Sequence, residues 1–308
     1  MTTRISSFTR ALDSGRLVVT AECLPPRGSD SDAIRKFSDS LPKNLDAVVV
    51  ADNPDAIRSS AISTALLMRK YGHDSVILGM TTRDRNRLAL MSDALGAAAL
   101  GISAILCVSG NHQSIDICPQ AGAANDLDSI QLIQALKDMI LHGSGLGGNM
   151  LEPKPNLQVG ALAHPYMLPL ELNLLRTRKK ILAGADFLIT QAVFDFVAFE
   201  VWMETIRTAG FDKRVAIIPS VMPMTDPLTA KDLKRRGVYG PIPDEVIKKM
   251  EKATDPKEAG LQIASETAAK LKGVSGVRGI HIINSGQAPL VAEVLDRAGI
   301  GSEKHGVA

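Results

Sequence analysis

The sequence predicts a (β/α)8 barrel, also called a TIM barrel, and three observations favour this fold class. Eight short runs rich in Val, Ile and Leu alternate with longer stretches that carry apolar residues at helical spacing. Several of these runs end in polar clusters, as expected where parallel strands meet at one mouth of a barrel. The 308 residues are 45% hydrophobic, which is enough for one large core. We therefore expect residues 1–308 to form a single domain.

The predicted strands are continuous apolar runs without strict alternation, which is typical of strands buried on both faces of a parallel sheet. In chain order they are residues 17–23, 45–51, 75–80, 102–108, 156–161, 186–190, 215–219 and 277–283. A doubly wound sheet is the alternative, but it should carry a glycine-rich phosphate motif after its first strand. The segment Leu-Pro-Pro-Arg-Gly at 24–28 is not such a motif, so the barrel is favoured.

Helices are predicted in the stretches between the strands. Five of them cover residues 54–70, 86–100, 126–141, 168–183 and 196–209. Glycine follows several of these stretches, as is common at helix C-caps. Residues 142–155 are rich in Gly and Pro and are predicted as a loop. Residues 231–272 are too long for one crossover helix, so we expect two or three extra helices before the last strand.

The composition favours a cytoplasmic protein that binds neither nucleic acid nor membrane. The chain has 35 basic and 33 acidic residues and no basic block, so a polyanionic partner has no electrostatic support. No apolar run approaches the roughly 20 residues of a membrane-spanning helix. Residues 1–16 lack the apolar core of a secretory signal. The three cysteines are unevenly spaced and form no metal-binding pattern, so no metal site is expected.

Polar side chains with hydrogen-bonding or acid–base capacity follow the predicted strands. They include Glu22, Thr81, Thr82, Ser109, Asn111, His164 and Gln191. Hydroxyl, amide and carboxyl side chains at the ends of buried strands contribute little to the stability of a core. The pattern therefore predicts an enzyme active site at the mouth. His112 and His281 are further candidates for the mouth in this topology.

Several motifs resemble the methylenetetrahydrofolate reductase family, in family order and over nearly the whole chain. Glu-Cys-Leu-Pro-Pro at 22–26 resembles the Glu-Phe-x-Pro-Pro opening of that family, and Ile-Thr-Gln-Ala-Val-Phe-Asp at 189–195 resembles its Ile-Thr-Gln-x-x-Phe-Asp strand. Ile-Pro-Ser-Val-Met-Pro at 218–223 is similar to its Ile-Pro-Gly-Ile-Met-Pro segment. Met-Thr-Thr-Arg-Asp-Arg-Asn at 80–86 resembles the branch of acetogenic and related anaerobic bacteria.

The resemblance implies a flavin-dependent oxidoreductase acting on a CH–NH bond. It would reduce 5,10-methylenetetrahydrofolate to 5-methyltetrahydrofolate, in one-carbon metabolism and methionine biosynthesis. Hydride would pass from NAD(P)H to flavin N5 and then to the folate, with FAD favoured over FMN. An oligomer is expected, and the branch resemblance adds an electron-delivering or zinc-containing partner subunit. Two alternatives stay open: a subunit that receives electrons only from a partner protein, and a pterin-binding barrel that transfers methyl groups without redox chemistry.

The resemblance also implies roles for individual residues. Glu22 would be the general acid that protonates a folate nitrogen, and the alternative is a carboxylate that caps local backbone amides. Gln191 and Phe194 would contact the pterin, although Phe194 equally suits the core. Asp195 is predicted as the N-cap of the next helix. Thr81, Thr82, Ser109, Gly110, His164 and Lys180 would bind the flavin. For Lys180 a solvated helix position is the alternative.

The predicted site departs from the family pattern at four positions. Asn111, assigned to substrate binding, stands where the family has an Asp, so a negative charge near the flavin is lost. Gly79 replaces a His or Gln, His164 replaces a Tyr, and Ser285 replaces an Arg. We expect these changes either to retune the flavin or to weaken the chemistry.

Overall fold

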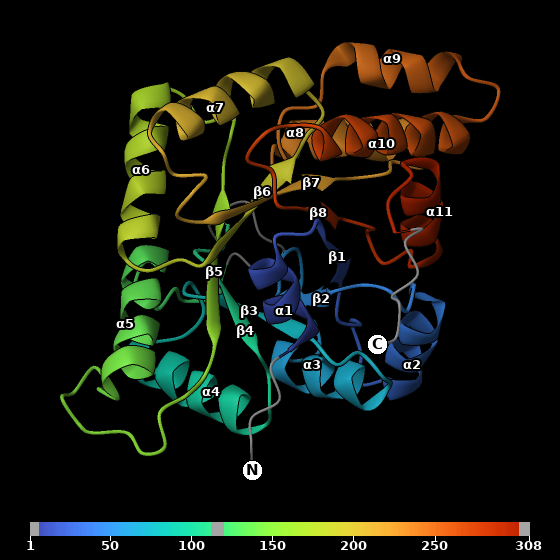
Figure 1. Cartoon of the computed structure of the whole chain (residues 1–308). Coiled ribbons are helices and arrows are strands. Elements are labelled where there is room, and N and C mark those ends of the chain that lie inside the picture. The colour runs from blue at the N-terminus through green and yellow to red at the C-terminus, as the bar shows by residue number, and fades with distance from the viewer. Residues whose placement is uncertain (1–5, 112–119, 302–308) are drawn as a thin grey trace.

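The computed structural model describes residues 6–111 and 120–301. Eight parallel strands form a closed barrel in chain order, in which β1 pairs with both β2 and β8 (Figure 1). The strands are β1 Val18–Cys23, β2 Ala47–Val50, β3 Val76–Thr81, β4 Ala104–Val108, β5 Gln158–Ala163, β6 Phe187–Ala192, β7 Ala216–Val221 and β8 Gly279–Ile282. The predicted (β/α)8 barrel is confirmed, and each predicted strand overlaps an observed one.

Helices surround the barrel (Figure 1). Their bounds are α1 Ser7–Ser14, α2 Ser31–Ser40, α3 Ala61–Lys70, α4 Arg87–Ala99, α5 Ser129–His142, α6 Leu170–Leu182, α7 Phe196–Thr208, α8 Pro227–Arg236, α9 Asp244–Lys252, α10 Pro256–Lys272 and α11 Pro289–Arg297. The extra helices before the last strand are confirmed as α8, α9 and α10. The helix predicted from residue 54 begins only at Ala61. Residues 54–60 instead form a loop, and helices α1, α2 and α11 were not predicted.

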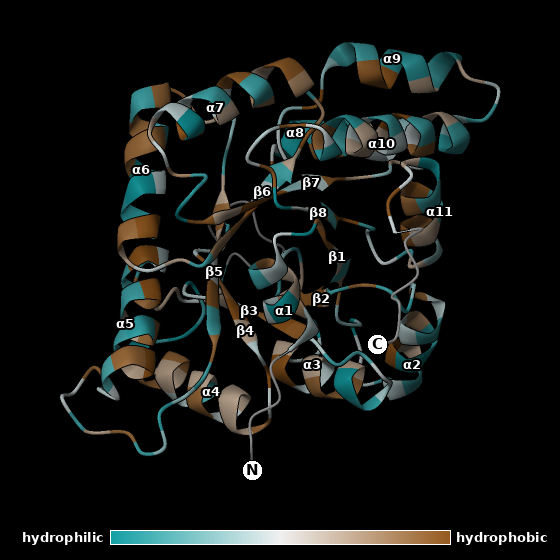
Figure 2. Cartoon of the chain, in the orientation of Figure 1, coloured by the Kyte–Doolittle hydropathy of each residue, from teal (hydrophilic) through white to brown (hydrophobic). Residues whose placement is uncertain are grey.

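The core has an inner and an outer layer. The inner layer fills the barrel, where Phe8 of α1 packs edge-on against Phe187 of β6 with ring centroids 5.0 Å apart. Gly160 of β5 makes room for this contact, since a Cβ there would lie 2.2 Å from the Phe187 ring. The outer layer joins the strands to the helices, which carry both hydrophobic and hydrophilic residues in Figure 2. Helix α1 therefore closes the end of the barrel at which the strands begin.

Aspartate and asparagine side chains begin several helices and so orient the loops that precede them. Asp195 is the N-cap of α7 and accepts a hydrogen bond from the Ala198 amide at 2.9 Å, as predicted. Asp128 caps α5 in a reciprocal capping box with Gln131. These caps hold the polar residues between strand and helix in defined positions. None of the helices in the described part of the chain is long and apolar enough to cross a membrane.

Candidate active site

A large pocket opens at the carboxyl ends of the barrel strands. It contains about 1240 Å³ of space not occupied by protein atoms, part of which is open to solvent. Eight of the ten predicted site residues line it: Glu22, Thr81, Ser109, Gly110, Asn111, His164, Lys180 and Gln191. The acid of the first strand and the amide of the sixth therefore face the same hollow, as the sequence predicted.

Glu22 lies at the end of β1 and is 8% exposed. Its Oε2 atom has no hydrogen-bond partner among the described residues. Burial is the largest cause that raises the pKa of Glu22 to about 7, and the Arg58 charge opposes the rise. A substantial fraction of this carboxyl is therefore protonated near neutral pH, so that it can donate a proton to a ligand in the pocket.

Gln191 and His164 form a neutral polar pair on the β5–β6 side of the pocket. Gln191 Nε2 donates to the Val238 carbonyl at 3.3 Å, and the Gln191 side chain also hydrogen-bonds His164. Burial lowers the pKa of His164 to about 4, and the nearby Lys180 charge acts in the same direction. The imidazole is therefore uncharged at neutral pH, and this part of the pocket offers hydrogen bonds without a charge.

Lys180 is on α6, where its Nζ donates to the Leu162 carbonyl at 2.6 Å. Burial lowers the pKa of Lys180 to about 8, so the side chain is not the solvated lysine of the alternative interpretation. It also lines a second cavity, which adjoins the first and includes Asn173, Arg176 and Ser129. The sequence analysis missed these three residues. The spacing of Arg176 and Lys180, one helical turn apart, was the available signal.

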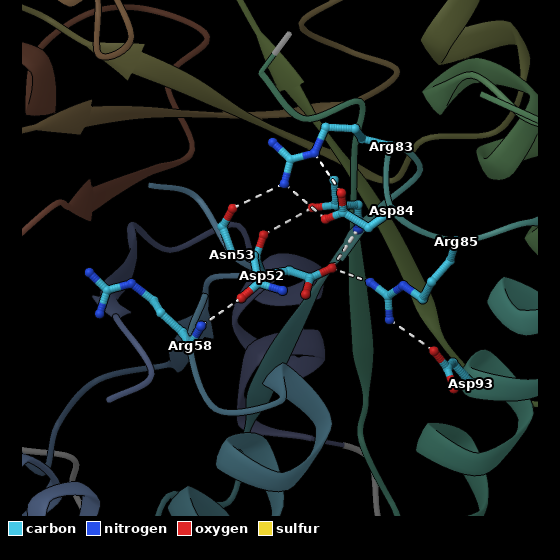
Figure 3. A network of polar contacts seen from close by, with 8 residues as sticks. Asp52, Asn53, Arg58, Arg83, Asp84, Arg85 and Asp93 are labelled. Atoms are coloured by element: carbon cyan, nitrogen blue, oxygen red, sulfur yellow. Dashed lines mark hydrogen bonds and ion pairs between the residues drawn. The ribbon is translucent and has the colours of Figure 1, made fainter. Parts of the chain in front are cut away.

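A charged network beside the pocket joins the loops after β2 and β3 and reaches Asp93 of α4 (Figure 3). Asp52 Oδ2 accepts the Thr81 amide at 2.8 Å and pairs with Arg85, which also pairs with Asp93 at 2.8 Å. Arg83 pairs with Asp84. Asp52 lines the pocket, and the sequence analysis missed it.

Asn111 has a structural reason to be an amide. Its side-chain Nδ2 donates to the Pro54 carbonyl at 3.2 Å. Separately, the backbone carbonyl of Asn111 accepts a hydrogen bond from Arg83 at 3.3 Å. A carboxylate at 111 could not donate to Pro54 and would face the carbonyl oxygen unfavourably. The loss of the family's negative charge therefore accompanies a hydrogen bond that joins the β4 and β2 loops.

Gly79 has a similar explanation. A Cβ at this position would lie 2.7 Å from the Val50 carbonyl oxygen and 3.3 Å from the Asp52 amide nitrogen. The backbone at the end of β2 and just beyond it thus occupies the space that a side chain at 79 would need.

Two further predicted residues, Phe194 and Thr82, lie outside the pocket lining, whereas His281 is part of it. Phe194 packs against a hydrophobic cluster of residues from β6, α8, α9 and the segments after β7 and β8, and it is not among the lining residues. Thr82 is buried, donates its amide to the Val108 carbonyl, and is likewise outside the lining. His281 does line the pocket, 2.9 Å from Thr20 Oγ1, and burial lowers its pKa to about 3. His112 lies outside the described residues.

Several known proteins are similar to this chain. Methylenetetrahydrofolate reductase 2 of Saccharomyces cerevisiae is 28% identical over 286 residues, which are 86% of this chain and 43% of the yeast protein. The 5,10-methylenetetrahydrofolate reductase of Pectobacterium carotovorum is 26% identical over 69% of this chain and 66% of its own length. The chain thus spans less than half of the yeast relative. An uncharacterized protein from Clostridium thermocellum, described as binding two copies of 5-methyl-5,6,7,8-tetrahydrofolic acid, shares the fold with a TM-score of 0.68. That protein is 16% identical, and the match covers 96% of this chain and 99% of the other.

The family model described as methylenetetrahydrofolate reductase matches residues 7–299, from α1 to the end of α11. This range contains every motif that carried the resemblance and all the residues that line the pocket. On this evidence the chain belongs to the methylenetetrahydrofolate reductase family.

Proposed function

We propose that this protein reduces 5,10-methylenetetrahydrofolate to 5-methyltetrahydrofolate with the help of a flavin. The observation that carries the proposal is that Glu22, a buried carboxyl whose pKa is raised to about 7, shares one pocket with Gln191. Family membership supports the same reaction, and so do the names of the yeast and Pectobacterium relatives. The whole proteins can differ, because the yeast relative is more than twice as long as the matched region.

The chemistry requires a proton and a hydride at neighbouring atoms of the folate. Opening the five-membered ring leaves a nitrogen that must be protonated, and Glu22 is the acid that supplies this proton. Gln191 holds the pterin edge, since its amide both donates and accepts hydrogen bonds without bringing a charge into the apolar pocket. The flavin supplies the hydride.

The residues around the two cavities fit a flavin. The larger pocket is roomy enough for a tricyclic ring beside the pterin, and it offers the unpartnered Oε2 of Glu22. Lys180 and Arg176 bring positive charge to the adjoining cavity, where the first residue of α5, Ser129, also lies. We assign the ring contacts to Thr81, Ser109, Gly110 and His164 and the phosphate contacts to Lys180, with FAD favoured over FMN.

Flavin content and turnover of the purified protein test this proposal. Visible absorbance after incubation with FAD or FMN should show a bound flavin, and mass spectrometry of the released cofactor should tell the two apart. Conversion of 5-methyltetrahydrofolate with an artificial electron acceptor should fall by about a hundredfold or more in Glu22→Gln, in the range of a lost general acid. The exposed Glu200→Gln is the matched control. A protein that binds neither flavin would contradict the reductase proposal.

The electron donor is a separate question, and a partner protein is the second candidate. The pocket wall at Gly79 and Asn111 lacks the His or Gln and the carboxylate that the family pattern has at these positions, which favours a retuned flavin over ordinary NAD(P)H use. Slow NADH oxidation by the chain alone, followed by a large increase on adding the partner subunit, would support this candidate. Rapid NADH or NADPH oxidation by the isolated chain would argue for the direct donor.

A further inference from the structure

Glu22 has an arginine–carboxylate pair beside it, contributed by the loop after β2. Arg58 Nε and Nη2 donate to the two carboxylate oxygens of Asp55 at 2.7 and 2.9 Å. Arg58 Nη1 donates to the Pro25 carbonyl at 2.7 Å, three residues after Glu22. The Arg58 side chain is only 10% exposed. The guanidinium thus joins the segment that carries Glu22 to the loop that carries Asp55.

The groups that influence Glu22 come from four parts of the chain. The loop after β2 contributes Arg58 and Asp55, the turn after β8 contributes the Ser285 backbone, and the α8–α9 loop contributes Tyr239. Within β1 the neighbour is Cys23, and burial raises the pKa of this thiol to about 12. Burial also raises the pKa of Tyr239. Because the thiol and the phenol stay neutral, the charges acting on Glu22 from these groups are those of Arg58 and Asp55.

We propose that Asp55 and Arg58 are positioning residues that together set how strongly Glu22 holds its proton: the Arg58 guanidinium favours release of the proton, and Asp55 neutralises that charge and so keeps Glu22 in its acid form. This inference rests on the proposed function, in which Glu22 must hold a proton for the folate nitrogen. Arg58 has a second task, since its bond to Pro25 fixes the backbone just beyond the acid. Arg27, which contacts Asp55 at 3.2 Å through a mostly exposed side chain, adds little to this balance.

Asp55 and Arg58 have opposite effects on the pH at which Glu22 releases its proton. Without the Asp55 charge, the uncompensated Arg58 cation favours the ionised carboxylate, and the acid releases its proton at lower pH. Without the Arg58 charge, the Asp55 carboxylate repels a second negative charge, and Glu22 holds its proton to higher pH. A purely structural role predicts no such opposition, because damage to the loop would shift the pH at which Glu22 releases its proton in the same direction in both variants.

Infrared spectroscopy of the carboxylic acid C=O stretch measures this proton directly. The Glu22 band is obtained as the difference between the protein and its Glu22→Gln variant over a pH series. In the unaltered protein its midpoint should lie near pH 7. We expect Asp55→Asn to lower the midpoint by about one pH unit and Arg58→Gln to raise it by about the same amount. The double variant and Arg58→Lys should return close to the unaltered value.

Asp126→Asn is the matched control, because it removes the same charge from another bidentate arginine pair, that of Arg87. Shifts of Asp55→Asn and Arg58→Gln in one direction, or shifts no larger than that of the control, would overturn the proposal. The infrared titration needs neither flavin nor turnover, so its result stands apart from the reductase assay. A protein that shows the opposed shifts but no reductase activity would refute the proposed function and leave this charge balance intact.

Discussion

Replacing Glu22 with Gln should change how the stability of the protein depends on pH. Burial raises the pKa of Glu22 from 4.5 to about 7. A shift of that size corresponds to roughly 3 kcal/mol of free energy of unfolding. The contribution is fully present below pH 4.5, where both states are protonated, and it is lost as the pH rises through 7, because the folded state must then hold a buried charge. The wild-type protein should therefore lose about this much stability relative to Glu22→Gln between pH 4.5 and pH 8.

Urea unfolding at a series of pH values measures this difference. Trp202 is the only tryptophan and is 1% exposed, so its fluorescence reports the loss of the native core. The gap between the unfolding free energies of wild type and Glu22→Gln should change by roughly 3 kcal/mol across the range. The control Glu200→Gln, at an exposed position of α7, should follow the wild-type curve. Parallel curves for wild type and Glu22→Gln would refute the reasoning about this buried acid.

Three other substitutions test the pocket wall and the phosphate contact. Asn111→Asp should lose about 1–3 kcal/mol of stability in urea, because the donor to the Pro54 carbonyl disappears; an unchanged midpoint would show that this bond is unimportant. Gly79→Ala should lower the thermal midpoint and cost about 1–3 kcal/mol of stability, because the new Cβ would lie 2.7 Å from the Val50 oxygen. A midpoint equal to that of wild type would disprove this close approach. Lys180→Met should weaken FMN or FAD binding by about tenfold, or ~1.4 kcal/mol, in fluorescence titrations, with no effect on riboflavin, which has no phosphate. Because the pKa of Lys180 is lowered to about 8, wild-type affinity should also fall as the pH rises above that value.

The barrel could be predicted because each strand carries its own local signal. Runs such as Ala-Val-Val-Val in β2 and Ala-Ile-Leu-Cys-Val in β4 are apolar on both faces, which few other environments explain. The start of α3 could not be predicted in the same way. Arg58 and Ser59 bond to the backbone of Pro25 and Pro26 at the end of another strand, and these distant contacts hold residues 54–60 out of the helix.

In the candidate site, too, some residues could be predicted from local signals and others depend on contacts between distant segments. Residues at the carboxyl end of a strand, such as Glu22 and Gln191, could be placed at the mouth because the topology alone brings strand ends together. Arg176 reaches the adjoining cavity through the packing of α6, and its spacing from Lys180 was the one signal for it along the chain. Asp52 directly follows the predicted strand 45–51, so the rule for strand ends applies to it as well. Phe194 follows the same strand as Gln191, but its aromatic ring is taken up by the apolar cluster under α8 and α9.

The aromatic plug made by Phe8 and Phe187 has a kinetic consequence for the proposed reaction. Because that end of the barrel is closed, all reactants would reach the pocket from the mouth. Where NAD(P)H is the donor, the oxidised nicotinamide would have to leave before a pterin could bind. Turnover would then alternate between two half-reactions, and double-reciprocal plots at several fixed concentrations of the second substrate should give parallel lines.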